Sequence, residues 1–130
     1  MNRRSIPEAD AQRAIVQALQ VALPRDAIVH HCANEVTEAG SRGQIRQSIL
    51  VGMGVHFGFA DLIVITGSRV LFLEVKSPSG RLRKSQEVFR DTVCAQSFGW
   101  ALVRSVDDAL AALADNGFTC RVRPARRVAP

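Results

Sequence analysis

The 130-residue chain has few of the residues that mark several common functional classes. It contains no Tyr, one Trp and six Phe, so an aromatic platform for stacking the bases of single-stranded nucleic acid has little support. No long apolar run is present, which excludes a transmembrane helix. The basic N-terminus has no apolar segment behind it, so a secretory signal is not expected.

Cysteine is scarce and poorly spaced for cross-linking or for binding a metal. Cys32, Cys94 and Cys120 lie far apart in the sequence and form no C-x-x-C pair. An odd number of isolated cysteines supports neither a disulfide framework nor a zinc site. We therefore expect an intracellular, reducing location, the cytoplasm, and no membrane partner.

The rest of the composition is that of a globular domain with a basic excess. Hydrophobic residues make up 47% and charged residues 22% of the chain, which is ordinary for a soluble domain. A length of 130 residues suits a single domain over 1–130 that buries one core, with a basic, loosely ordered tail at about 121–130. Seventeen Lys and Arg against twelve Asp and Glu leave a net charge of +5, so a polyanionic partner is expected.

Hydrophobic periodicity and turn-forming residues predict an alternating order of helices and strands. Ser5 and Glu8 have the spacing of a helix-capping box, and the apolar pattern behind them predicts a helix of about 15 residues that ends before Pro24. Ser85 and Ser105 are placed to cap two later helices. Further strands are predicted over residues 27–33, 100–103 and 118–122. With the hairpin described below, this order predicts an α/β domain with a mixed sheet and helices on both faces.

Residues 34–58 are predicted to form a long, glycine-rich connection. Long connections of this kind are usually functional or mobile. We interpret the segment as a flap that contacts a nucleic-acid backbone through Arg42 and Arg46, with His56 as a further phosphate contact. A solvated loop that binds nothing fits the sequence equally well. The apolar residues 49–51 can add a short strand or anchor the loop to the core.

The most informative segment spans residues 60–76, where two short apolar runs flank a tight turn. Residues 62–65 and 70–73 are uninterrupted and rich in β-branched side chains, which predicts strands buried on both faces. Gly67-Ser68 suits a two-residue hairpin turn of the Gly-first type. The segment is therefore predicted to form an antiparallel β-hairpin.

Counting outward from this turn pairs Thr66 with Arg69 and brings Asp61 opposite Glu74. Directly opposed residues point to the same face, with Cβ atoms about 4.5–5.5 Å apart. Lys76 lies two residues beyond Glu74 and returns to that face, because strand side chains alternate with a period of two. Three charged side chains are therefore expected to converge at one end of an apolar sheet.

Two carboxylates at this separation repel each other unless a proton or a cation lies between them. Mg²⁺ and Mn²⁺ prefer oxygen ligands and commonly bind through one or two carboxylates together with substrate phosphates. The ammonium of Lys76 can stabilise charge on a phosphoryl group or help to deprotonate an attacking water. This combination points to metal-assisted hydrolysis of a phosphodiester. The competing interpretation is an ordinary ion pair between Asp61 and Lys76, with Glu74 solvated at a sheet edge.

A basic segment follows Lys76 directly. Arg81, Arg83 and Lys84 lie within four residues of one another, after a turn marked by Pro78 and Gly80. Surface charge clusters are usually solvated and inert, but the position beside Lys76 favours contact with phosphates. Such contacts do not read sequence.

These motifs resemble a known nuclease family. Asp61, followed after twelve residues by Glu74-Val75-Lys76, resembles the PD-(D/E)XK nuclease core. The basic loop, the helix with Gln86, the later Arg104-Ser105 and an opening helix with Glu8 and Gln12 resemble the VRR-NUC branch of that superfamily. The resemblance covers residues 5–117. Ala60 stands where many members have proline, which shapes the backbone and supplies no ligand.

The resemblance implies a restriction-endonuclease-like fold, a mixed β-sheet core flanked by helices in αβββαβ order. It also implies roles for particular residues. The family's metal ligands correspond here to Asp61, Glu74 and the carbonyl of Val75, and Glu8 corresponds to the acid that completes the metal shell. The family's catalytic lysine corresponds to Lys76, and Gln86 corresponds to the glutamine that supports the site. Glu8 has a local capping role available as well, and the sequence does not decide between the two.

The expected function is that of a Mg²⁺- or Mn²⁺-dependent endonuclease acting on DNA. Small stand-alone members of the family resemble Holliday junction resolvases, which implies a homodimer and a preference for branched DNA. One alternative is an accessory module that binds nucleic acid without cleaving it. Another is a sequence-specific restriction-type nuclease, for which the chain is short because it leaves no room for a separate recognition domain.

Overall fold

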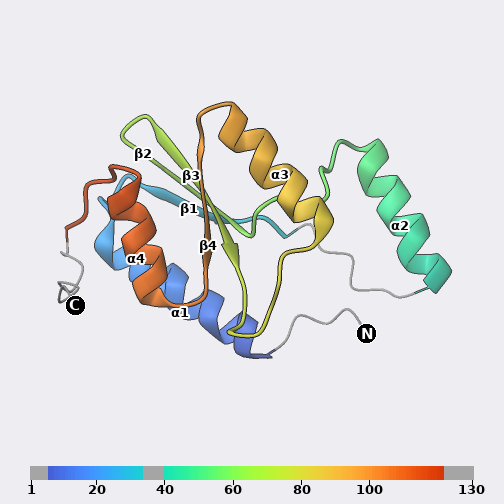
Figure 1. Ribbon diagram of the computed structural model, residues 1–130, viewed down its shortest axis with the longest axis horizontal. Coiled ribbons are helices and arrows are strands. Elements are labelled where there is room, and N and C mark those ends of the chain that lie inside the picture. The colour runs from blue at the N-terminus through green and yellow to red at the C-terminus, as the bar shows by residue number, and fades with distance from the viewer. Residues whose placement is uncertain (1–5, 34–39, 122–130) are drawn as a thin grey trace.

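The computed structural model describes residues 6–33 and 40–121 (Figure 1). The elements follow in the order α1 (Ile6–Ala22), β1 (Ile28–His31), α2 (Gly40–Gly52), β2 (Leu62–Thr66), β3 (Arg69–Val75), α3 (Lys84–Ala95), β4 (Gly99–Val103) and α4 (Val106–Asp115). The predicted mixed-sheet α/β fold is confirmed. The αβββαβ core is followed by α4, the helix predicted after Ser105, and is interrupted by α2, which was not predicted. None of the described helices is long and apolar enough to cross a membrane.

One sheet organises the molecule, with strands in the order β1-β2-β3-β4. The pairs β1/β2 and β2/β3 are antiparallel, and β3 pairs in parallel with β4. A parallel pair requires a crossover, which α3 supplies. In this arrangement the C-terminal ends of β3 and β4 and the start of β2 lie at the same end of the sheet.

Two hydrophobic clusters lie on opposite faces of this sheet. Helices α1 and α4 lie side by side on one face (Figure 1). There the alternate residues Leu62, Val64, Leu71 and Leu73 are fully buried. On the other face α3 packs through Phe89, whose ring meets that of Phe72 edge-on at 5.3 Å. Both faces of the central hairpin are thus covered, as its continuous apolar runs predicted.

The hairpin has the predicted register and a different turn type. Thr66 pairs with Arg69, Ile65 with Val70 and Leu62 with Leu73. Gly67 and Ser68 both have positive φ, 58° and 63°, which defines a type I′ turn rather than the predicted Gly-first type. The two-residue length alone fixes the pairing, so the register is unchanged.

Helix α2 lies within the segment that the sequence predicted as a loop, so that prediction is wrong over residues 40–52. The eight residues between Gly43 and Gly52 contain no glycine or proline, which is enough for two helical turns. Residues 49–51 belong to this helix and form no strand. The helix lies at the edge of the molecule, beyond α3 from the sheet (Figure 1).

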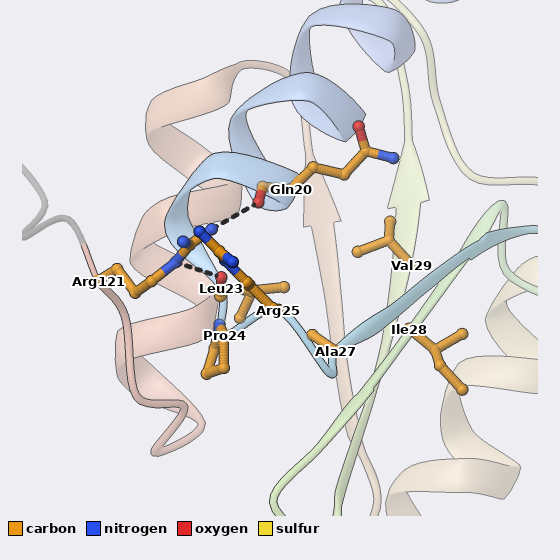
Figure 2. Close-up of a pocket in the computed structure, with 8 residues that line it drawn as sticks. All are labelled: Gln20, Leu23, Pro24, Arg25, Ala27, Ile28, Val29 and Arg121. Carbon is orange, nitrogen blue, oxygen red and sulfur yellow. Dashed lines mark hydrogen bonds between the residues drawn. The ribbon is translucent and has the colours of Figure 1, made fainter.

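The predicted strand over 118–122 is not observed in residues 118–121, and Val122 lies outside the described residues. Arg121 instead lies against the end of α1, where its backbone N–H donates to the Ala22 carbonyl. Its guanidinium donates to the carbonyls of Leu23 at 2.8 Å and Gln20 at 3.2 Å (Figure 2). The segment thus satisfies the last carbonyls of a helix rather than a sheet edge.

A groove of about 440 Å³ lies between Arg121, the end of α1 and the start of β1 (Figure 2). Ile28, which lines it, pairs with Ile65 next to the hairpin turn. The groove is therefore at the opposite end of the strands from Asp61 and Glu74.

Candidate active site

Asp61 and Glu74 face each other at the end of the hairpin away from its turn. Asp61 directly precedes β2, and Glu74 is the next residue after the Leu62–Leu73 pair on β3. Both are buried, with 6% and 2% of their surfaces exposed. The Asp61 Oδ2 accepts a hydrogen bond from the Val75 N–H at 2.8 Å, and the Asp61 carboxylate is close enough to Glu74 to raise the pKa of Glu74. The two acids therefore share one buried position, as the hairpin register predicted.

Glu74 has a strongly perturbed carboxyl group. Burial, followed by the charge of the neighbouring Asp61 carboxylate, raises the pKa of Glu74 to about 9. The charge of Lys76 lowers this pKa, but burial and Asp61 outweigh it. Glu74 consequently carries a proton at neutral pH when no cation is bound.

The two oxygens of Glu74 have different surroundings. Its Oε1 accepts a hydrogen bond from the Gln86 Nε2 at 2.8 Å and lies 3.9 Å from the Lys76 Nζ. Its Oε2 is buried and has no hydrogen-bond partner among the residues that the structure describes. A buried acceptor without a partner costs free energy, and a divalent cation between the acids would satisfy it. The carboxylates of Asp61 and Glu74, buried side by side, are the oxygen ligands that a hard cation such as Mg²⁺ or Mn²⁺ prefers.

Lys76 lies just beyond the end of β3 and is 7% exposed. Its backbone N–H donates to the Val103 carbonyl at 3.1 Å, which extends the parallel pairing of β3 with β4 by one step. The side chain therefore comes from a fixed piece of backbone, on the side of the strand that carries Glu74.

Gln86 connects α3 to the acid pair. While its Nε2 donates to Glu74, its Oε1 accepts from the Arg83 N–H at 2.8 Å. Arg83, rather than the predicted Ser85, is the N-cap residue of α3, which begins at Lys84. Because both ends of its amide are engaged, Gln86 presents its N–H group to Glu74 in a set orientation.

Glu8 is near the acid pair without joining it as a third clustered ligand. Its charge contributes to raising the pKa of Glu74, and its side chain is partly buried on α1. Within residues 6–33 and 40–121, no group of three or more His, Cys, Asp or Glu side chains is close enough to hold a metal. The role of Glu8 as a ligand, like that of the Val75 carbonyl, therefore stays a prediction. Ser5, its expected capping partner, lies outside the described residues.

The basic residues divide into two groups. Arg81, Arg83 and Lys84 are exposed in the segment that joins Lys76 to Gln86. Arg42 and Arg46 are exposed on α2, a separate element. The first group is thus tied by short stretches of chain to both sides of the acid pair.

His56 lies on the connection between α2 and β2. Its ring meets that of Phe89 on α3 edge-on at 5.9 Å, and its Nδ1 is 3.0 Å from the Phe57 carbonyl. The same connection approaches α3 closely at Gly58, where an added Cβ would be 2.1 Å from the Ser85 carbonyl oxygen. These contacts hold the exposed imidazole beside the first turns of α3.

Sequence reasoning assigned no role to Arg104 or to Gln12, two residues with distinctive surroundings in the structure. Arg104 donates from Nη1 to the carbonyls of the turn that follows Lys76. Gln12, one helical turn from Glu8, is 7% exposed, and its Oε1 has no hydrogen-bond partner within residues 6–33 and 40–121. The only signal for either was its presence in the segments that resemble the VRR-NUC family.

Comparison with known proteins supports this resemblance through the fold. No family model matches the sequence, and no curated protein does. A solved structure of a VRR_NUC domain protein superposes with a TM-score of 0.62, covering 88% of this chain and 90% of that chain, at 14% sequence identity. The chain has the fold of a VRR_NUC domain protein. At this identity the likeness establishes the architecture, and the chemistry depends on the residues described above.

Proposed function

We propose that this chain is a Mg²⁺- or Mn²⁺-dependent endonuclease that hydrolyses phosphodiester bonds in DNA. The observation that carries the proposal is the buried pair of Asp61 and Glu74 with Lys76 beside it, in which one oxygen of Glu74 has no partner in the described part of the chain. Two buried acids and a buried lysine at a sheet end are costly to maintain in a purely structural role. The VRR_NUC fold is consistent with the same interpretation.

Each residue has a separate task in this proposal. A divalent cation supplies, when bound, activation of water and neutralisation of phosphate charge. Asp61 and Glu74 hold it, with the Val75 carbonyl and Glu8 as further ligands. Lys76 directs its ammonium toward the phosphate and the attacking water. Gln86 keeps the Glu74 carboxylate oriented through the 2.8 Å hydrogen bond.

The exposed cations would bind the DNA backbone. Arg81, Arg83 and Lys84 are the nearest to the site along the chain, and Arg42, Arg46 and His56 extend the set. Contacts to phosphates bind without reading sequence. A preference for branched DNA, such as a four-way junction, and a homodimer with two sites are proposed by analogy with small nucleases of this type.

A panel of linear, nicked, flapped and four-way-junction DNAs, incubated with Mn²⁺ or with EDTA, tests the proposal. We expect Mn²⁺-dependent cleavage that is lost in Asp61→Asn and in Lys76→Met, while Asp91→Asn on α3, a matched control for charge, cleaves normally. The alternative function, a module that binds DNA without cutting it, predicts equal affinity for all variants and no cleavage with any metal. That outcome would reject the proposed nuclease function.

A further inference from the structure

The turn after Lys76 is gathered around a single arginine nitrogen. Residues 77–80 form a tight turn in which the Gly80 N–H donates to the Ser77 carbonyl at 3.0 Å. The carbonyls of Ser77 and Gly80 both accept from the Arg104 Nη1, at 2.5 and 2.7 Å, and that of Pro78 lies at 3.4 Å. Charged donors make stronger hydrogen bonds to carbonyls than neutral ones do, so Arg104 is the main cross-link between this turn and the rest of the domain.

Arg104 is itself fixed by the elements on either side of it. It follows β4, and its backbone N–H donates to the Asp108 Oδ2 at 2.9 Å. Asp108 in turn donates its N–H to the Ser105 Oγ, the N-cap of α4, at 3.1 Å. The guanidinium therefore extends from a rigid corner between β4 and α4, and the turn is held against that corner.

The turn packs along the stem of Lys76. A Cβ placed on Gly80 would lie 3.4 Å from both the Cβ and the Cδ of Lys76. The backbone of Gly80 thus lies against the lysine stem and forms a wall on one side of it. If the turn opened, this wall would be lost and the lysine, now 7% exposed, would reach solvent.

We propose that Arg104 is a positioning residue that holds the 77–80 turn closed and thereby keeps the Lys76 ammonium at the acid pair. It acts on the substrate only through Lys76 and through the start of the basic segment at Arg81. The role in cleavage rests on the proposed nuclease function, whereas the hold on the turn does not.

Arg104→Met tests this role, since methionine keeps much of the apolar stem and removes the donors. Misplacement of a catalytic group by about 1 Å costs about a hundredfold in rate, so we expect kcat to fall about ten- to a hundredfold with KM little changed. The salt slope of DNA binding should stay that of the wild type, since no phosphate contact is lost. Arg104→Lys, which retains a cationic donor, should lose less. Arg69→Met is the matched control, because Arg69 also donates to a backbone carbonyl, that of Asn116, at 3.4 Å near the far end of the hairpin.

Amide hydrogen exchange at Gly80 provides a readout that does not depend on activity. Loss of the hydrogen bonds from Arg104 to the 77–80 turn should accelerate exchange of this N–H by about tenfold in Arg104→Met. The Asp108 amide serves as an internal control for folding. If Arg104→Met does not fold, the same comparison is made with Arg104→Lys. Unchanged Gly80 exchange overturns the proposal, and so does a reduced salt slope with Gly80 protected, which would make Arg104 a phosphate contact. Absence of cleavage by the wild type would reject the nuclease function. The exchange rate at Gly80 would then decide by itself whether Arg104 holds the 77–80 turn.

Discussion

Replacing Glu74 with glutamine is expected to stabilise the protein in the absence of metal, and increasingly so as the pH rises. Burial and the neighbouring Asp61 raise the pKa of Glu74 from its ordinary value of 4.5 to about 9. A carboxyl group whose pKa is higher in the folded state than in the unfolded chain contributes fully to stability below pH 4.5. It loses that contribution as the pH rises toward 9, because the unfolded chain ionises while the folded one must keep its proton. Glutamine retains the shape and the polar atoms of the protonated acid and has no proton to lose.

The magnitude follows from the size of the pKa shift. Between pH 4.5 and 9 the folded state holds one more proton than the unfolded state, which lowers the free energy of unfolding by about 1.4 kcal/mol per pH unit. The difference between Glu74→Gln and the wild type should therefore widen by roughly 4 kcal/mol from pH 5 to pH 8. This is a large part of the total stability of a small domain.

Urea unfolding at pH 5, 6, 7 and 8 in EDTA measures this difference. Glu87→Gln on α3 removes the same charge outside the acid pair and serves as the control. Added Mn²⁺ should restore stability to the wild type at pH 8 and have little effect on Glu74→Gln. A difference between Glu74→Gln and the wild type that stays constant with pH would refute the reasoning, because Glu74 would then be an ordinary ionised carboxylate.

Two further predictions concern the surroundings of the acid pair. Gly58→Ala should destabilise the fold by about 2–3 kcal/mol in urea unfolding, because its Cβ would meet the Ser85 carbonyl at 2.1 Å. Gly54→Ala, which has a positive φ but nothing within 4 Å, should cost clearly less, and equal losses would refute the clash. The double variant Arg81→Ala and Lys84→Ala should weaken DNA binding and lower its salt slope by about two phosphate contacts. An unchanged slope would remove that segment from the interface.

The central part of the site could be predicted because it depends on local sequence. A two-residue turn fixes which residues of a hairpin oppose each other, and the side-chain period of two then fixes the shared face. Counting residues outward from the turn is therefore enough to predict that Asp61 and Glu74 face each other. The turn type did not follow, because Ser68 adopts a positive φ that its residue type only weakly favours.

Other features depend on contacts between distant parts of the chain. The glycines around α2 suggested a loop, although the stretch between Gly43 and Gly52 is long enough for a helix. The apolar pattern of residues 118–122 suggested a strand, but Arg121 finds acceptors at the end of α1, about a hundred residues away. Arg104 shows the same limit, since no local pattern reveals that three carbonyls of the 77–80 turn surround its side chain.

Titration calorimetry of Mn²⁺ binding at pH 7, in two buffers of different ionisation enthalpy, tests the central claim most directly. If the acid pair is a cation site, the metal must replace the proton of Glu74, and binding should release about one proton per metal. Affinity should rise with pH up to about 9, the pKa of Glu74, and Glu74→Gln should abolish both effects. Failure of Mn²⁺ to bind, or binding to the wild type and to Glu74→Gln alike without release of a proton, would contradict the claim.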